Sequence, residues 1–162
     1  MTEPFSIIVA RQRIPVPDVP DGATWLDDRH RAPPVTDGRA RDAERVTGIV
    51  LHTSRGVRGH VRPGALPSSR AELLALYQSR TSRDVSWHFT VDTDGTVVQQ
   101  ADAALWMCWH AGHANGWSVG IECVQQPGSG DLYEAQLRSL VAVVEALCGA
   151  LRSPRRTPVG AD

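Results

Sequence analysis

Two segments of the chain alternate side chains in the pattern of a β-strand that is covered on both faces. In residues 46–52, VTGIVLH, the apolar run ends in His52, which shares a face with Val50. In residues 117–124, WSVGIECV, Glu122 is the single charged residue of an otherwise apolar run. We therefore expect two strands of one sheet, with His52 at the end of the first and Glu122 inside the second.

A third alternating segment leads into a hairpin. Residues 85–92 predict a strand with Trp87 on one face and His88 on the other. The sequence Asp92-Thr-Asp-Gly95 is a turn signal, because glycine readily takes the positive φ that tight hairpins need. Residues 96–100, TVVQQ, are then the returning strand.

Two other segments repeat apolar residues with the 3.6-residue period of a helix. Ser69-x-x-Glu72 is a capping box at the start of the first, which we expect to run to residue 80. The second begins near Asp131 and places its apolar face at positions 137, 140, 141, 144, 147, 148 and 151. The order strand, helix, hairpin, strand, helix predicts an α/β fold in which a single mixed β-sheet is flanked by α-helices.

Residues 1–45 are rich in proline, aspartate and arginine. Proline fixes φ and cannot donate to a β-ladder, so this segment is expected to be an extended arm packed over a domain formed by residues 46–162. The run FSIIVA is a candidate short strand within the arm. Trp25 and Leu26 are its expected anchors.

The composition limits the classes of partner. A net charge of −1 gives no reason to expect nucleic acid, and no apolar run is long enough for membrane insertion. Three cysteines without a CxxC pair indicate no disulfide framework. The first residues do not form a signal peptide, so we expect synthesis in the cytoplasm and another route of delivery for any target outside it.

Glu122 and His52 are the two candidates for chemistry on the sheet. A carboxylate in an apolar strand is costly, and burial raises its pKa towards the range of a general acid or base. The alternative for Glu122 is a structural ion pair. A histidine at a strand end suits a cleft, and the alternative for His52 is a core imidazole with its N–H satisfied.

A connection rich in histidine and tryptophan precedes the strand that carries Glu122. Trp109, His110 and Asn115 offer the stacking and hydrogen bonds that a sugar- or peptide-binding groove needs, while a structural cluster is the alternative. His88 is a further candidate for this groove, although a structural imidazole is favoured there. The spacing of His and Cys matches neither HExxH nor paired CxxC and HxxxH metal motifs.

Three stretches, IVLHTS, SWHFTVDTDGTVVQQ and WHAGHANGWSVGIE, follow one another in an order that resembles a known family. They resemble the zinc-dependent N-acetylmuramoyl-L-alanine amidases of type 2, which are related to peptidoglycan recognition proteins and phage lysozyme-amidases. The resemblance covers residues 46–160. It implies a mixed sheet flanked by helices and cleavage of the amide between N-acetylmuramic acid and L-alanine in peptidoglycan.

The resemblance also implies roles for single residues. His52 corresponds to the first zinc ligand and Glu122 to the acidic residue that activates the zinc-bound water. His110 and Asn115 match positions that line the substrate groove, and Trp109 adjoins them. The expected partners are therefore peptidoglycan or muropeptides, and the expected role is endolysin-type degradation of the cell wall.

One part of the family pattern departs at the end of the chain. The family places two more zinc ligands after the last helix, whereas here Thr157-Pro-Val-Gly160 is followed by Ala161-Asp162. From the sequence we expect the site to be completed by a further C-terminal segment, a partner chain, or His110, His113 or Asp162. Two functions stay open: a zinc hydrolase, and a non-catalytic muropeptide-binding module with a degenerate metal site.

Overall fold

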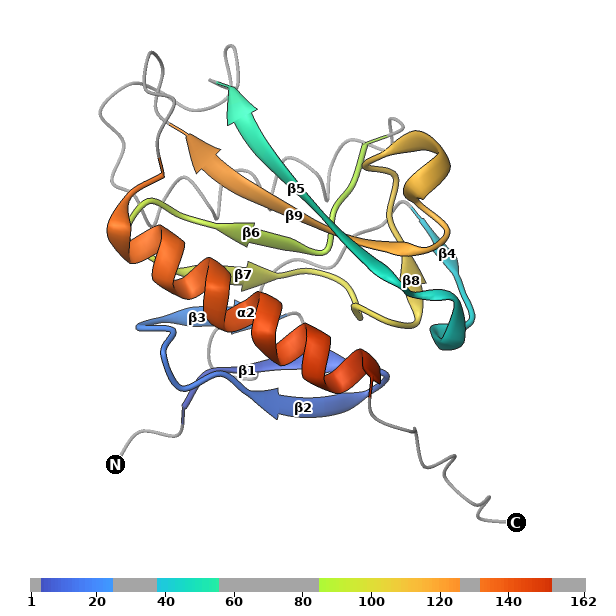
Figure 1. Ribbon diagram of the computed structural model, residues 1–162, viewed down its shortest axis with the longest axis horizontal. Helices are drawn as coiled ribbons and strands as arrows, with labels where there is room; N and C mark the ends of the chain where they lie inside the picture. Colours follow the sequence, from blue (N-terminus) through green and yellow to red (C-terminus); the bar gives the residue numbers. More distant parts are fainter. Residues whose placement is uncertain (1–3, 25–37, 56–84, 126–131, 153–162) are drawn as a thin grey trace.

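The computed structural model describes residues 4–24, 38–55, 85–125 and 132–152 (Figure 1). In chain order its elements are β1 (Ser6–Val9), β2 (Gln12–Pro15), β3 (Gly22–Thr24), β4 (Arg39–Ala40), η1 (Ala43–Arg45), β5 (Gly48–Arg55), β6 (Phe89–Val91), β7 (Val97–Gln99), β8 (Trp106–Met107), η2 (Gly112–Ala114), β9 (Ser118–Gln125) and α2 (Glu134–Arg152). No helix among these residues is both long and apolar enough to cross a membrane.

A five-stranded sheet with the order β3-β7-β6-β9-β5 forms the centre of the structure. β5 and β6 both pair in parallel with β9, β6 pairs antiparallel with β7, and β7 pairs in parallel with β3. Figure 1 shows α2 lying across one face of this sheet. The mixed sheet confirms the predicted fold class. The helix expected over 69–80 lies outside the described residues.

The core lies between the sheet and α2. Phe89 and Ile121 from the sheet pack with Leu140 and Leu147 of the helix, and all four are buried. Burial of side chains of this size stabilises the fold by about 1.5–3 kcal/mol each. Gln136 adds a polar link, because its Nε2 donates to carbonyl oxygens at the ends of β6 and β9.

The expected apolar face of α2 is partly wrong. Leu137 and Val141 are each 48% exposed, whereas Gln136 and Ser139 are completely buried. Small and polar residues face the sheet here because the β6–β7 turn comes very close: a Cβ on Gly95 would lie 2.8 Å from Ser139 Oγ. The helical repeat of apolar residues in the sequence cannot reveal such a contact, because the turn that makes it lies far away along the chain.

Two strand boundaries also differ from the prediction. β5 continues to Arg55, so His52 lies inside its strand rather than at its end. In the segment 85–92 only Phe89–Val91 is a strand, and Val85 is 50% exposed. Trp87 does not share the core face of β6; it donates from Nε1 to Thr90 Oγ1 on the opposite face.

The predicted hairpin between β6 and β7 is confirmed. Gly95 has φ of +90°, and its N–H donates to the carbonyl of Asp92, which closes the turn. The returning strand, β7, covers Val97–Gln99. The side chain of Gln99 in β7 bonds to the backbone of β1: it accepts from the Ile8 N–H and donates to the Ile8 carbonyl.

Part of the predicted N-terminal arm is built into the core. FSIIVA forms the expected strand, β1, and pairs with β2, which the sequence did not reveal. The turn between them places Ala10 and Arg11 at positive φ. β3 joins the central sheet, and β4 pairs with β8. The domain boundary at residue 45 stays a prediction, and the proposed anchors Trp25 and Leu26 lie outside the described residues.

Asp102 links the β1–β2 turn to the connection after β7. Its carboxylate accepts backbone N–H bonds from Ala10 and Arg11 in the turn, and from Ala104 and Leu105 in its own loop. It is 9% exposed. Four donors would otherwise lose their partner, and each buried unsatisfied group costs about 1–3 kcal/mol.

We expect Asp102→Ala to lower the free energy of unfolding by about 3 kcal/mol, because water can replace only part of this network. Urea denaturation followed by circular dichroism measures the change. Asp18→Ala is the matched control, since Asp18 is exposed. A loss of stability no larger than that of the control would contradict the assigned role.

Candidate active site

His52 and Glu122 lie side by side in the sheet. The β5–β9 pairing sets His52 opposite Glu122, and the β6–β9 pairing sets Glu122 opposite Thr90. Paired residues point to the same face and stand on strands about 4.8 Å apart. Their neighbours Ile121 and Phe89 point the other way, into the core beneath α2. We call His52, Glu122 and Thr90 the polar row; it occupies the face turned away from α2.

Glu122 holds its carboxyl group in a poorly solvated place. Burial raises its pKa to about 7. Within the described part of the chain the one ion pair joins Arg138 to Glu134 on α2, so the alternative of a structural ion pair for Glu122 finds no support there. A carboxyl group with this pKa takes up and releases a proton near neutral pH, as a general acid or base must.

The His52 imidazole meets that of His110 edge to face. His52 Nε2 and His110 Nδ1 are 3.2 Å apart, and the ring planes meet at 80°. Burial lowers the pKa of His52. Burial, and then the proximity of His52, lowers the pKa of His110 to about 4. Both rings are therefore neutral at pH 7.

The loop that carries His110 is held in place by Asn115. The Oδ1 atom of Asn115 accepts N–H bonds from His110 and Ala111 at 2.9 and 2.7 Å. The ring of His110 lies against Gly120 of β9, where an added Cβ would come 2.5 Å from His110 Cγ. The small residue in the Gly-Ile-Glu motif is therefore needed for the ring to lie on the sheet.

Arg41 holds the same loop through hydrogen bonds of its guanidinium group, and no sequence pattern pointed to this role. Its guanidinium donates to the carbonyl oxygens of Ala103, Ala104, Asn115 and Ser118 at 2.6–3.2 Å. Burial lowers its pKa to about 10, so it stays charged at neutral pH. One arginine among many in a polar segment looks like any exposed arginine until the chain is folded.

His88 lies behind the polar row and is completely buried. The Gly120 N–H donates to Nδ1, so the ring proton must sit on Nε2, which donates to the Trp106 carbonyl at 2.8 Å. Burial, reinforced by the charge of Arg41, lowers the pKa of His88 to about 3. Both ring nitrogens therefore bond to backbone groups, and Arg41 Nη2 also lies 3.2 Å from Nε2.

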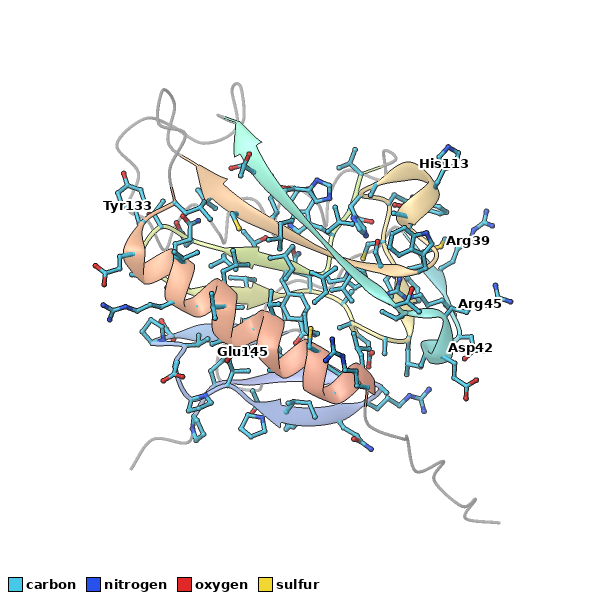
Figure 2. All side chains as sticks on the ribbon, viewed as in Figure 1. Arg39, Asp42, Arg45, His113, Tyr133 and Glu145 are labelled. Carbon is cyan, nitrogen blue, oxygen red and sulfur yellow. The ribbon has the colours of Figure 1, made fainter. Side chains whose placement is uncertain are left out.

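Trp109 is half-buried beside Arg39, whose guanidinium carbon lies 5.6 Å from the centre of the indole ring. His113 is exposed and projects outward from η2 (Figure 2). The structure thus brings three of the candidate residues together: His52, Glu122 and His110. Asn115 supports them, whereas His88 does not reach the surface.

The described residues do not make a complete zinc site. Within the described ranges, no three His, Cys, Asp or Glu side chains form a group that could hold a metal ion. A catalytic zinc ion has three protein ligands and an open position for water. His52 is a suitable imidazole donor, but its partners in this part of the chain are too few.

Solved structures share this architecture. The endolysin amidase LysCS from Clostridium intestinale URNW is similar at 17% identity, with a TM-score of 0.52; the match covers 82% of this chain and 76% of the LysCS chain. AmpD is similar at 24% identity over 72% of both chains, with a TM-score of 0.52. Drosophila PGRP-LB with tracheal cytotoxin is similar at 13% identity over 76% and 73%, with a TM-score of 0.56. The fold is therefore that of peptidoglycan amidases and recognition proteins.

The chain belongs to the N-acetylmuramoyl-L-alanine amidase family Amidase_2, which it matches over residues 42–160. It therefore carries an amidase-type domain, and the resemblance seen in its motifs is confirmed. No curated protein matches the chain.

The buried state of His88 predicts a specific dependence of stability on pH. Its pKa is about 3 in the folded chain and 6.5 when unfolded, so only the unfolded chain takes up this proton between those values. The stabilisation of the folded state by neutral His88 is fully present above pH 6.5, and it is lost as the pH falls towards 3. The free energy of unfolding, measured in urea between pH 7 and 4, should fall less steeply in His88→Gln than in the wild type. Equal slopes would contradict the prediction.

Proposed function

We propose that this domain hydrolyses the amide bond between N-acetylmuramic acid and L-alanine in peptidoglycan or muropeptides. The observation that carries the proposal is the polar row, in which parallel strands hold His52 and Glu122 in register on the face away from α2. Family membership supports the reaction class. A role in degradation of the cell wall follows from the proposed substrate.

Glu122 is the proposed group for proton transfer. Hydrolysis adds water to the amide carbonyl and breaks the bond from carbon to nitrogen, so a proton must leave the water and reach the departing amine. A carboxyl group with a pKa of about 7 can accept the first proton and deliver the second. Its low solvation also strengthens its interactions with charge that develops on the substrate.

In this proposal some residues of the loop contact the substrate and others hold the loop in place. Trp109 keeps part of its indole exposed and can stack on a sugar ring. His110 borders the polar row through its contact with His52, while Asn115 is 8% exposed and its Oδ1 accepts from the loop backbone. We assign Trp109 and His110 to the substrate side and Asn115 to holding the loop; His88 supports them from behind.

Zinc is the cofactor implied by the family, and His52 is the ligand that we propose from the described residues. Its imidazole is partly exposed, lies in the polar row and is neutral at pH 7, as metal ligation requires. Of the further ligands that the sequence analysis named, His110 and His113 are described and form no group of three potential ligands with His52, whereas Asp162 lies outside the described part of the chain.

A binding module is the second candidate. It is favoured by one observation, the lack of a three-residue metal group within the described ranges. In that case the domain would hold muropeptide without cleaving it. The structure of PGRP-LB with tracheal cytotoxin concerns a protein of the same fold with a bound ligand of this kind.

Glu122→Gln should lower the rate of muropeptide cleavage by about 10²–10⁴-fold, because the amide cannot exchange a proton. Release of the stem peptide, followed by mass spectrometry, measures the rate, and isothermal titration measures muropeptide binding. Binding should persist. Glu145→Gln on the outer side of α2 is the matched control (Figure 2). A wild-type protein that binds but never cleaves would instead establish the binding module.

His52→Ala should weaken zinc binding by the full-length chain at least tenfold, because an imidazole donor is removed. Competition with a chromophoric chelator gives the affinity. His113→Ala, which removes an exposed histidine from η2, should leave the affinity unchanged. Equal affinities in the wild type and His52→Ala would exclude His52 as a ligand.

A further inference from the structure

The positions of hydrogen atoms around His110 follow from one hydroxyl group. Ser118 Oγ lies 2.6 Å from the Ala114 carbonyl oxygen, which can only accept, so the serine hydroxyl donates its single hydrogen there. Ser118 Oγ also lies 3.4 Å from His110 Nε2. The hydroxyl has no second hydrogen to give. The serine oxygen can only accept across this contact, so a hydrogen bond here requires the His110 proton on Nε2.

The next link in the chain is then fixed as well. A neutral imidazole carries one ring proton, so His110 Nδ1 is left with a lone pair. This atom faces His52 Nε2 at 3.2 Å. His52 must donate in this bond, which puts its proton on Nε2 and leaves Nδ1 unprotonated. The hydrogen bonds run in one direction from His52 through His110 and Ser118 to the Ala114 carbonyl.

The surroundings hold the His110 ring in the orientation that this chain needs. Asn115 Oδ1 fixes the His110 backbone N–H, and the absence of a Cβ at Gly120 gives the ring its place on β9. On its other side the ring of His88 lies 5.8 Å away, centre to centre. His88 is itself bonded to backbone through both nitrogens. His110 is thus restrained by the loop, the sheet and a buried ring.

We propose that His110 is a positioning residue that holds His52 in its Nε2–H tautomer, so that Nδ1 is the nitrogen through which His52 acts. This deepens the proposed function and rests on it for the role of His52. Nδ1 and Nε2 point in different directions from the ring, so the choice of tautomer decides which direction can accept a proton or coordinate an ion. A side chain that fixes its neighbour in this way acts on orientation as well as on proton placement.

Nitrogen-15 NMR of the imidazole side chains tests the direction of the bonds without any activity. In the full-length wild-type chain at pH 7, His52 should show a protonated Nε2 and an unprotonated Nδ1. A through-hydrogen-bond coupling should connect His52 Nε2 with His110 Nδ1. A protonated Nδ1 on His52, or a protonated Nδ1 on His110, would overturn the proposal.

Two substitutions at the same position separate positioning from bulk packing. Glutamine can accept from His52 with its oxygen and donate to Ser118 with its amide nitrogen, whereas phenylalanine can do neither. His110→Gln should therefore keep the His52 Nε2–H tautomer, and His110→Phe should give a mixture of tautomers. His113→Ala should leave the His52 signals unchanged. The same His52 tautomer in all variants would overturn the proposal.

Kinetics then connect the tautomer with the reaction. If the wild type cleaves muropeptide, His110→Phe should lower kcat about 10–100-fold, and His110→Gln should recover most of it. Equal kcat values for the two variants, despite different tautomers, would overturn the positioning role while leaving the proposed hydrolysis intact. Absence of cleavage by the wild type would overturn the proposed function, and the NMR result would still decide the hydrogen-bond chain.

Discussion

The parallel pairing of β5 with β9 is the constraint on which the candidate site depends. Eight residue pairs in register set His52 beside Glu122. A slip of one residue along either strand would turn one of these side chains towards α2, because side chains alternate between the faces of a strand. The apolar residues of β9 that face α2 oppose such a slip, since they would lose their place in the core. Packing on one face therefore fixes the chemistry on the other.

Buried polar groups hold the irregular parts of the chain against this sheet. The connection between β7 and β9 has little regular structure, so its backbone groups need partners elsewhere. Arg41 supplies donors for its carbonyl groups, and Asp102 supplies acceptors for its N–H groups. Both side chains also join the N-terminal segment to the loop that carries His110. The loop is thus positioned by a segment that precedes the central strands.

Three histidines close together illustrate how surroundings decide the role of one residue type. His88 is buried completely and bonded to backbone at both nitrogens, so it serves as a structural element. His110 is partly buried and bridges the sheet and loop through His52 and Ser118. His52 is the member of the three that lies in the polar row. Their order along the chain carries no trace of these differences.

The sequence alone determined the strands around His52 and Glu122, the hairpin at Gly95 and the helix over α2, because alternation, turn chemistry and helical period are local properties. It also determined the family, through motifs of ordinary spacing. Only the tertiary structure decided which face of α2 is buried and that β5 continues past His52. It also decided that Arg41 binds the carbonyl groups of the loop that carries His110. These depend on which backbone groups come close after folding, and residues distant in sequence supply them. The sequence identified His52 and Glu122 as two separate candidates. The register of β5, β9 and β6 brings them together with Thr90 in the polar row.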